Sequence, residues 1–271
     1  MPFVQAADLV VHYAVDGAAP SRDPDAPVVM LANSLGTSFH MWDQQIAALA
    51  RSHRVLRYDM RGHGLTDTTS SPDAGVATVE RLAADAVALL DALRIARVDF
   101  VGLSIGGMVG QRVAAEFPDR IGALALCATG SRIGTVAGWN ERIETVQRDG
   151  IAAIAGAGME RWFTARSRAE LPAVVRGFAN MLTRTPVDGY VEGCQAVRDA
   201  DLRADDARIR CRTLVLAGAE DLVTTPAMGA EMRDAIANAE LIVLDDAAHM
   251  LCAEQPEATD AALLAFLEGG R

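Results

Sequence analysis

The residues most able to do chemistry form a short glycine-framed segment, Gly102-Leu103-Ser104-Ile105-Gly106-Gly107. It follows an apolar run typical of a buried strand, and helix-like residues 105–117 come after it. A G-x-S-x-G pattern in that position indicates a sharp strand-to-helix turn that lifts the serine hydroxyl above a sheet. Any side chain larger than hydrogen at Gly102 or Gly106 would collide there. Ser104 is therefore the candidate nucleophile, and a glycine-rich turn with an idle serine is the alternative.

A serine hydroxyl is a poor nucleophile unless a base takes its proton. His249 is the candidate base, because it follows the last predicted strand, residues 241–244, where open α/β sheets place their ligands. His63 also follows a strand-like run and is the rival base, although its flanking glycines indicate that it shapes a turn near the site. His12 and His53 lie within or before strand-like segments, so we expect them to be structural or exposed.

The base needs an acid that fixes its tautomer and stabilises its charged form. Asp221 stands at the exit of the strand-like run at residues 213–217 and is the candidate. Glu220 is its neighbour and the alternative acid. Asp245 and Asp246 lie close to the candidate base in sequence, but we expect them to form the turn that precedes it.

The oxyanion of a tetrahedral intermediate needs preorganised N–H donors. The backbone N–H of Ile105 is one candidate, because it lies directly after the nucleophile at a helix N-terminus. The second donor should come from the loop after the first core strand, residues 32–36. We predict the N–H of Leu35, with Ser34 beside it. A simple glycine turn is the alternative for this loop.

Elements that position these residues are predicted from hydrophobic runs and periodicity. Short runs that are apolar on both faces indicate buried strands of a parallel sheet: residues 28–32, 55–58, 98–103, 123–128, 213–217 and 241–244. An apolar stripe at helical spacing predicts a helix over residues 79–93, with Thr78 as its N-cap. Residues 256–267 predict a final helix. The alternation of strands and helices favours an α/β fold with a mostly parallel central sheet flanked by helices.

This alternation breaks between residues 131 and 206, which contain no strand-like run. We predict a helical cap there, with helices over residues 141–148, 151–163 and 171–181. The α/β core is then residues 1–130 and 207–271. Two polar segments that contain proline, residues 17–26 and 70–75, are predicted to be surface connections.

Composition limits the classes of function. The 271 residues carry a formal net charge of −11 with no basic stripe, which argues against nucleic acid as a partner. No apolar run approaches the roughly 18 residues of a membrane span, and the N-terminus is unlike a signal peptide, so we expect a cytoplasmic protein with no membrane partner. The four cysteines are scattered, which predicts buried thiols, no metal site and no cofactor. An anionic substrate would need a local cation.

Five segments resemble α/β-hydrolases across nearly the whole chain: NSLGTSFHMWDQQ, RYDMRGHGLTD, GLSIGGMVGQ, AGAEDLVTTP and DDAAHMLCAEQP. The order Ser104, Asp221, His249 is the order of that fold. Asn33-Ser34 in the oxyanion loop, where most such enzymes carry His-Gly, is similar to the N-S-L-G-T pattern of 3-oxoadipate enol-lactonases. The cap segments TGSRIGTVAGWNERI, RWFT and YVEGCQAVRDADLR resemble them too.

The resemblance implies hydrolysis of 3-oxoadipate enol-lactone, a small molecule with a free carboxylate, in aromatic-compound catabolism. Arg132, at the junction of core and cap, is the candidate cation for that carboxylate, and Trp139 is a candidate apolar wall. Arg142 and Arg161 are the alternatives. The plain interpretations are a solvated arginine and a core tryptophan.

Two other functions fit the same residues. A general carboxylesterase or a carbon–carbon-bond hydrolase would use the same three side chains. A non-catalytic binding protein on this fold is the alternative from a different class. A haloalkane dehalogenase is disfavoured, because it would carry aspartate in place of Ser104.

Overall fold

The central sheet has eight strands in the order β1-β2-β4-β3-β5-β6-β7-β8. The computed structural model describes residues 2–17, 26–68 and 77–269, so residues 18–25 and 70–75 of the predicted surface connections lie outside it. The strands are β1 (Phe3–Ala6), β2 (Leu9–Gly17), β3 (Val28–Ala32), β4 (Arg54–Tyr58), β5 (Val98–Leu103), β6 (Ile121–Cys127), β7 (Arg212–Gly218) and β8 (Ala239–Leu244). From β4 to β8 every neighbouring pair is parallel, which confirms the predicted α/β fold with a mostly parallel sheet.

The two edges of the sheet differ from the sequence prediction. The hairpin β1–β2 pairs antiparallel through β2 with β4. The segment around His12 was predicted to be strand-like, but it was not among the buried strands of the parallel sheet, and the outer half of β2 is only partly buried or exposed. At the other edge, β8 was expected to be buried on both faces, and this was wrong. Ile242 and Val243 are 36% and 41% exposed, and β8 is the last strand of the described sheet, with a neighbouring strand on one side only.

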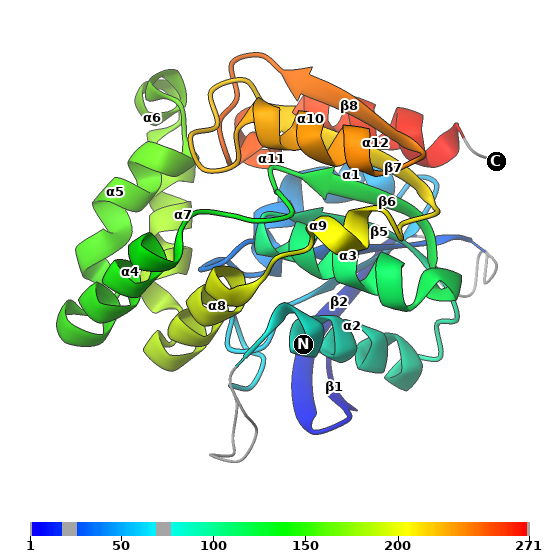
Figure 1. The fold of residues 1–271 in the computed structure, drawn as a ribbon, viewed down its shortest axis with the longest axis horizontal. Helices are drawn as coiled ribbons and strands as arrows, with labels where there is room; N and C mark the ends of the chain where they lie inside the picture. Colours follow the sequence, from blue (N-terminus) through cyan, green and yellow to red (C-terminus); the bar gives the residue numbers. More distant parts are fainter. Residues whose placement is uncertain (1, 18–25, 69–76, 270–271) are drawn as a thin grey trace.

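Helices cover both faces of the sheet (Figure 1). Residues of α2 (Val79–Ala92), α3 (Ile105–Glu116) and α10 (Pro226–Ala235) pack on one face, and those of η1 (Phe39–Gln45), α1 (Ile46–Leu49), α11 (Leu251–Glu254) and α12 (Pro256–Glu268) on the other. A short turn of 3-10 helix, η3 (Pro118–Arg120), precedes β6. The predicted N-cap is confirmed, since the Thr78 hydroxyl accepts the N–H of Arg81 at 3.2 Å.

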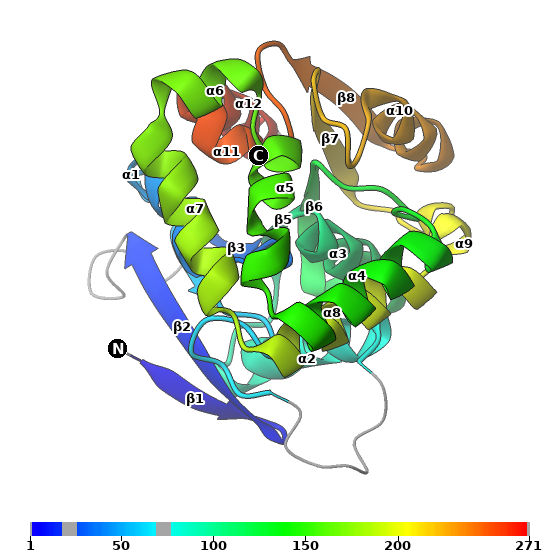
Figure 2. The ribbon, with the colours of Figure 1, turned by 90° about the vertical axis from the view of Figure 1, so that its left-hand side faces the viewer.

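Residues 131–206 contain helices and no strand, as predicted. They form α4 (Val136–Asp149), α5 (Ala152–Trp162), α6 (Ala165–Glu170), α7 (Pro172–Arg184), α8 (Val187–Asp199) and α9 (Arg203–Asp206). The α4–α8 helices stand together at one side of the sheet, and Figure 2 shows them in front of β3, β5 and β6. We refer to residues 131–206 as the cap, and their status as a separate domain stays a prediction.

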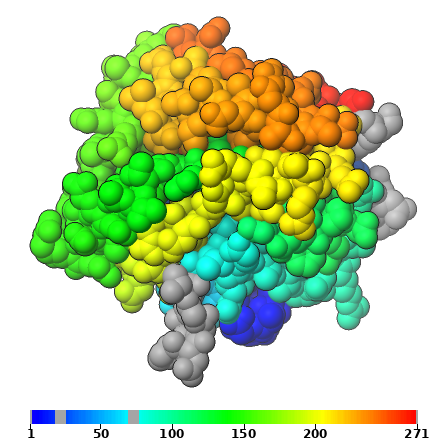
Figure 3. Space-filling model, viewed as in Figure 1, coloured from blue at the N-terminus to red at the C-terminus, as the bar shows by residue number. Residues whose placement is uncertain are grey.

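The cap helices begin and end at positions set by local capping and by proline. Helix α4 starts five residues earlier than predicted, because the Thr135 hydroxyl accepts the N–H of Gly138 at 3.2 Å. Both ends of the cap meet where the Leu202 N–H donates to the carbonyl of Ser131 at 2.8 Å. In space-filling view the cap lies directly against the core (Figure 3).

None of the described helices is long and apolar enough to cross a membrane.

Candidate active site

Ser104 occupies the strained turn that the glycine pattern predicts. It lies between β5 and α3 with φ 58° and ψ −120°, a conformation that L-residues rarely adopt. A Cβ atom at Gly102 would meet the carbonyl oxygen of Gly106, and one at Gly106 would lie 2.5 Å from that of Ala32. These close approaches confirm that both positions need glycine.

The backbone of Ser104 is held on both sides. Its N–H donates to the carbonyl of Cys127 at 3.0 Å, and its own carbonyl accepts the hydroxyl of Thr129 at 2.7 Å. Both partners lie at the C-terminal end of β6. The strained turn is therefore fixed by the neighbouring strand, which leaves the serine side chain at the end of the sheet, where it lines a cavity.

His249 and Asp221 lie together in the same region. Nδ1 of His249 is 2.9 Å from Oδ2 of Asp221, and both side chains are almost completely buried. Burial by itself raises the pKa of the Asp221 carboxyl, but the charge and hydrogen bond of His249 together with the hydrogen bonds of Thr224 outweigh it, so the pKa is lower than usual. His249 lines the same cavity as Ser104. The structure thus brings the three predicted residues to one site.

Asp221 has further partners that the sequence analysis missed. The Thr224 hydroxyl donates to Oδ2 at 2.6 Å, while the N–H groups of Val223 and Thr224 donate to Oδ1 at 2.7 and 3.0 Å. The spacing Asp-x-x-Thr after a strand is the signal that would have found Thr224, because short side chains in such turns bond the backbone two and three residues on.

The alternative acid and base lie elsewhere. Glu220 is exposed, and its backbone N–H donates to the carbonyl of Ala247. His63 has both ring nitrogens engaged away from the nucleophile, Nε2 with the N–H of Gly36 and Nδ1 with the carbonyl of Arg61, each at 3.0 Å. Asp246, with φ 54°, forms the expected turn before the candidate base.

The two candidate oxyanion donors are free. In the described part of the chain, the N–H groups of Leu35 and Ile105 have no hydrogen-bond partner. The N–H of Ser34 donates to Sδ of Met41 at 3.2 Å, so it is occupied, whereas the Ser34 side chain lines the cavity. Ile105 also lies at the N-terminus of α3, where the helix dipole favours negative charge.

Side chains of the loop itself hold its shape. The Asn33 amide donates to the carbonyl of Thr37 at 2.8 Å, and its oxygen accepts the N–H of Met60 at 3.2 Å. The Thr37 hydroxyl donates to the carbonyl of Ser34 at 2.8 Å. The side chains of Asn33 and Thr37, the first and last residues of the N-S-L-G-T segment, therefore hold its turn in one shape through hydrogen bonds.

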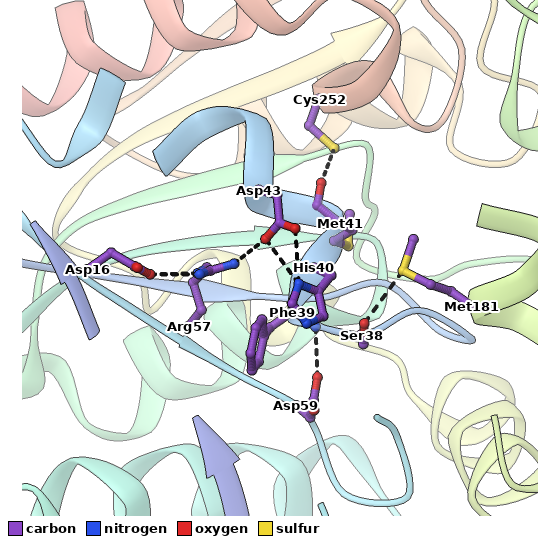
Figure 4. Close-up of polar contacts among 10 residues, drawn as sticks. All are labelled: Asp16, Ser38, Phe39, His40, Met41, Asp43, Arg57, Asp59, Met181 and Cys252. Carbon is purple, nitrogen blue, oxygen red and sulfur yellow. Dashed lines mark hydrogen bonds and ion pairs between the residues drawn. The ribbon is translucent and has the colours of Figure 1, made fainter. Parts of the chain in front are cut away.

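The chain that leaves this loop is anchored to both core and cap, as Figure 4 shows. The Phe39 N–H donates to Asp59 at 2.7 Å, and the Cys252 thiol lies 3.8 Å from the carbonyl of Met41. On the other side, the Ser38 hydroxyl lies 3.5 Å from Sδ of Met181 in α7. The loop therefore sits between elements that are far apart in sequence.

Ser104 and His249 open into an enclosed space under the cap. Its lining is Ser34, Leu35, Ser104, Ile133, Trp139, Arg142, Trp162, Tyr190, Val197, Val223 and His249. Five of these residues also line a larger cavity of about 460 Å³ between α4, α5 and the loop after β7, which Arg161 borders as well. Trp139 and Arg142 therefore border both cavities.

The structure places the candidate arginines differently from the sequence analysis. The side chain of Arg132 is half exposed, its nearest carboxylate is Asp201 at 3.9 Å, and it lines neither cavity. Arg142 lines both. Its guanidinium carbon lies over the Trp139 ring, 5.2 Å from the ring centroid, and its Nη1 lies 3.4 Å from the hydroxyl oxygen of Tyr190. Within the described ranges, no carboxylate lies within 4.0 Å of Arg142. Of the three candidate arginines, Arg142 is therefore the one that lines the cavity with Ser104 and His249.

The class of protein is defined by what stands at the C-terminal end of the mostly parallel sheet. These features are a serine at a nucleophile elbow, a buried histidine–aspartate pair and, among the described residues, two N–H groups without a partner. The α/β-hydrolase fold family model matches residues 27–256, and the chain belongs to that family. Across the described residues, no group of three or more histidine, cysteine or acidic side chains is placed to hold a metal ion.

Relatives with more specific names cover nearly the whole chain. A 3-oxoadipate enol-lactonase from Acinetobacter baylyi is 36% identical over 263 residues, 97% of this chain and 95% of that protein. The crystal structure of the enol-lactonase from Burkholderia xenovorans LB400 has a TM-score of 0.93 and 39% identity, and covers 98% of this chain and 100% of its own. A RutD protein from Rhizobium rhizogenes, named for carbamate hydrolysis, is 29% identical over 95% of this chain and 97% of its own. The resemblance to enol-lactonases is confirmed.

Proposed function

We propose that this protein is a serine hydrolase that opens 3-oxoadipate enol-lactone to 3-oxoadipate. The observation that carries the proposal is Arg142, an arginine with no carboxylate partner among the described residues, in the cavity that contains Ser104 and His249. A neutral ester gives no reason for such a cation. The names of the enol-lactonase relatives support the same substrate.

Acylation begins when Ser104 attacks the lactone carbonyl carbon and His249 takes the hydroxyl proton. Asp221, held by His249 and Thr224, keeps the ring oriented and stabilises its cationic form. The carbonyl oxygen becomes an oxyanion between the N–H groups of Leu35 and Ile105. When the ring C–O bond breaks, the leaving oxygen is an enolate. An enolate is a better leaving group than an alkoxide, so breakage of the C–O bond depends less on protonation of the leaving oxygen by His249.

Deacylation uses the same groups in the reverse order. The opened chain stays attached to Ser104 as an ester, and its enol becomes the ketone of the product. His249 removes a proton from a water molecule, which attacks the ester carbonyl while the oxyanion again lies between the two N–H groups. Loss of the serine oxygen releases the new carboxylate, and the proton returns to Ser104.

Arg142 is proposed to hold the carboxylate that takes no part in the reaction. The chain carries a formal net charge of −11, so its overall field repels an anionic substrate. A guanidinium that is stacked on Trp139 and partly withdrawn from water offsets that repulsion locally. Trp139 then forms one wall of the cavity and orients the arginine.

The test uses purified protein with freshly generated 3-oxoadipate enol-lactone and follows loss of the lactone. Ser104→Ala should abolish the loss. Arg142→Ala should raise KM by about 10-fold or more, as expected for a charge-assisted contact of about 1.5–3 kcal/mol. Arg132→Ala is the matched control and should behave as the wild type.

Three results would contradict parts of this proposal. Lactone decay no faster than in buffer, with an aryl ester still cleaved, would leave a general esterase. Equal effects of the two arginine substitutions would remove the role of Arg142. Cleavage of a simple carbamate in preference to the lactone would favour the activity for which the RutD relative is named.

A further inference from the structure

His63 lies directly beneath the oxyanion loop, on the turn that follows β4. Its side chain is almost completely buried, and each ring nitrogen has one backbone partner: the N–H of Gly36 at Nε2 and the carbonyl of Arg61 at Nδ1, both at 3.0 Å. An amide N–H only donates and a carbonyl only accepts. The ring must therefore carry its proton on Nδ1 and accept at Nε2.

We propose that His63 is a positioning residue that holds the oxyanion loop in its working shape by accepting the N–H of Gly36. The proposal rests on the function proposed above. In the loop, the N–H of Ser34 donates to Met41 and the N–H of Gly36 donates to His63, while the N–H of Leu35 between them has no partner in the described ranges. Fixing both neighbours leaves one donor aimed at the reacting carbonyl.

The turn that carries His63 is rigid enough to serve as a support. Arg61 makes two hydrogen bonds to the buried carboxylate of Asp85 in α2, at 2.7 and 2.8 Å. The Asp59 carboxylate accepts the N–H of Leu65 at 3.0 Å at the other end of the turn. The turn is held by α2 and by hydrogen bonds within the turn itself. If the oxyanion loop moved, the His63 ring would therefore stay in place and its hydrogen bond to Gly36 would break.

The cap closes over the same contact. Helix α8 crosses the turn so closely that a Cβ at Gly62 would lie 2.5 Å from the Cα of Gly189. One turn further along α8, a Cβ at Gly193 would meet the Leu35 side chain and would lie 3.5 Å from Cε1 of His63. The glycines of α8 let the cap cover both the histidine and the loop without pushing them apart.

Protonation of His63 would convert its acceptor into a donor that faces another donor. Among the described residues, Asp59 and Arg61 lie on the same turn as the ring, and Glu192 of α8 lines the same small cavity. Asp85 of α2 and Asp8 act on the neighbouring Arg61. Burial lowers the pKa of His63 and outweighs the contact with the Arg61 carbonyl and the charge of Asp59, both of which raise it. The neutral ring that the two hydrogen bonds require is therefore also the form that burial favours.

Two substitutions separate the acceptor from the rest of the ring. His63→Gln can place an oxygen near the position of Nε2 and keep the bond to Gly36. His63→Asn can keep only a donor to Arg61, near the position of Nδ1. Both remove the aromatic ring and leave a neutral amide, so they are matched in burial and charge. Each is assayed with p-nitrophenyl acetate, which does not depend on the identity of the natural substrate.

The expected result is a loss of about 10–100-fold in kcat for His63→Asn, below the 10²–10³-fold of a fully lost oxyanion donor. KM should change less than about threefold, and His63→Gln should stay within about threefold of wild type. Inhibition by an aryl trifluoromethyl ketone, whose adduct with Ser104 is an oxyanion, should weaken in His63→Asn by the same factor as kcat/KM.

Failures of this inference and of the proposed function are distinguishable. If the wild type cleaves both the lactone and the aryl ester, but the Asn and Gln variants lose activity equally or the ketone binds His63→Asn as tightly as wild type, the positioning role is overturned and the function stands. If the wild type cleaves neither the ester nor the lactone, the proposed function is overturned and the inference falls with it.

Discussion

The hydroxyl of Thr224 lies 2.6 Å from Oδ2 of Asp221, the same oxygen that faces His249. The threonine and the histidine therefore hold the same carboxylate oxygen from adjacent directions. The threonine oxygen is also 3.2 Å from Nδ1 of His249, so the three side chains form one compact group. A residue three positions after the acid thus takes part in orienting the base.

Thr224→Val should lower kcat by about 10–100-fold with little change in KM, because it removes one hydrogen bond, worth about 1.5–3 kcal/mol when the acceptor is charged, and leaves the side-chain volume similar. Thr225→Val is the matched control, since the side chain of Thr225 makes no capping hydrogen bond. Steady-state kinetics on an aryl ester measure both. Equal losses in the two variants would count against a specific role for Thr224.

Asp221→Asn should lower kcat by about 10⁴-fold, because an amide that donates to His249 favours the wrong tautomer of the ring. The fold should survive, since the amide oxygen still accepts the N–H groups of Val223 and Thr224. Glu220→Gln tests the neighbouring carboxylate, which is exposed, and should keep wild-type activity. A large loss in Glu220→Gln with activity retained in Asp221→Asn would reverse the assignment.

Glu254 is a buried carboxylate that joins the cap to the loop of the candidate base. Its two oxygens accept the N–H groups of Thr164 and Ala248, each at 2.7 Å. Glu254→Gln should lower the free energy of unfolding by about 1–3 kcal/mol, because one buried N–H then faces a donor. It should also lower kcat.

Thermal unfolding and aryl-ester kinetics check the prediction, with the exposed Glu257→Gln as control. A variant of Glu254 that unfolds at the wild-type temperature and retains full kcat would show that the two hydrogen bonds contribute nothing measurable to either property.

Asp206 makes stability depend on pH at the junction of core and cap. Burial raises its pKa to about 6, and the charges of Asp205 and Asp201 add to this, while the hydrogen bond from the Ser131 hydroxyl opposes it. Its other oxygen, Oδ1, is buried without a hydrogen-bond partner among the described residues. The pKa of Asp206 is higher in the folded than in the unfolded protein. The contribution of its protonated form to the free energy of unfolding is therefore present at low pH and is lost as the pH rises through about 6.

Asp206→Asn should therefore raise the midpoint of thermal unfolding at pH 8 by about 2–4 °C, the shift expected for about 1 kcal/mol in a domain of this size, and by less at pH 5. The exposed Asp119→Asn is the control. A gain that is the same at both pH values, or a loss confined to pH 8, would contradict an ionised, destabilising Asp206.

Local patterns predict much of this fold, for physical reasons that particular residues illustrate. Strands β3, β5 and β6 are buried on both faces, so their residues form continuous apolar runs that are visible without tertiary information. The elbow at Ser104 is equally local, because the clash that demands glycine arises within a few residues. The antiparallel pairing of the hairpin β1–β2 was not predicted, and the burial of β8 was predicted wrongly, since both depend on which strands lie at the edges of the sheet.

Helix α8 shows why part of the cap was harder to predict. Gly189 and Gly193 weaken helix propensity, and the segment gives little local signal. Their role is to let α8 approach Gly62 and Leu35, which lie more than 120 positions away in sequence. The benefit of such a glycine is a contact that exists only once the chain has folded.

By itself, the sequence determined the family, the parallel sheet and the candidates Ser104, Asp221 and His249, because strand ends and tight turns leave local patterns. Only the tertiary structure decided which arginine faces the cavity. Arg142 follows Trp139 by three residues, so helix α4 places both on one face, and the packing of the cap turns that face toward the serine. Arg132 precedes the helix and points to Asp201 and solvent. The direction of a side chain across a domain junction is set by packing between distant segments, and short-range patterns do not encode it.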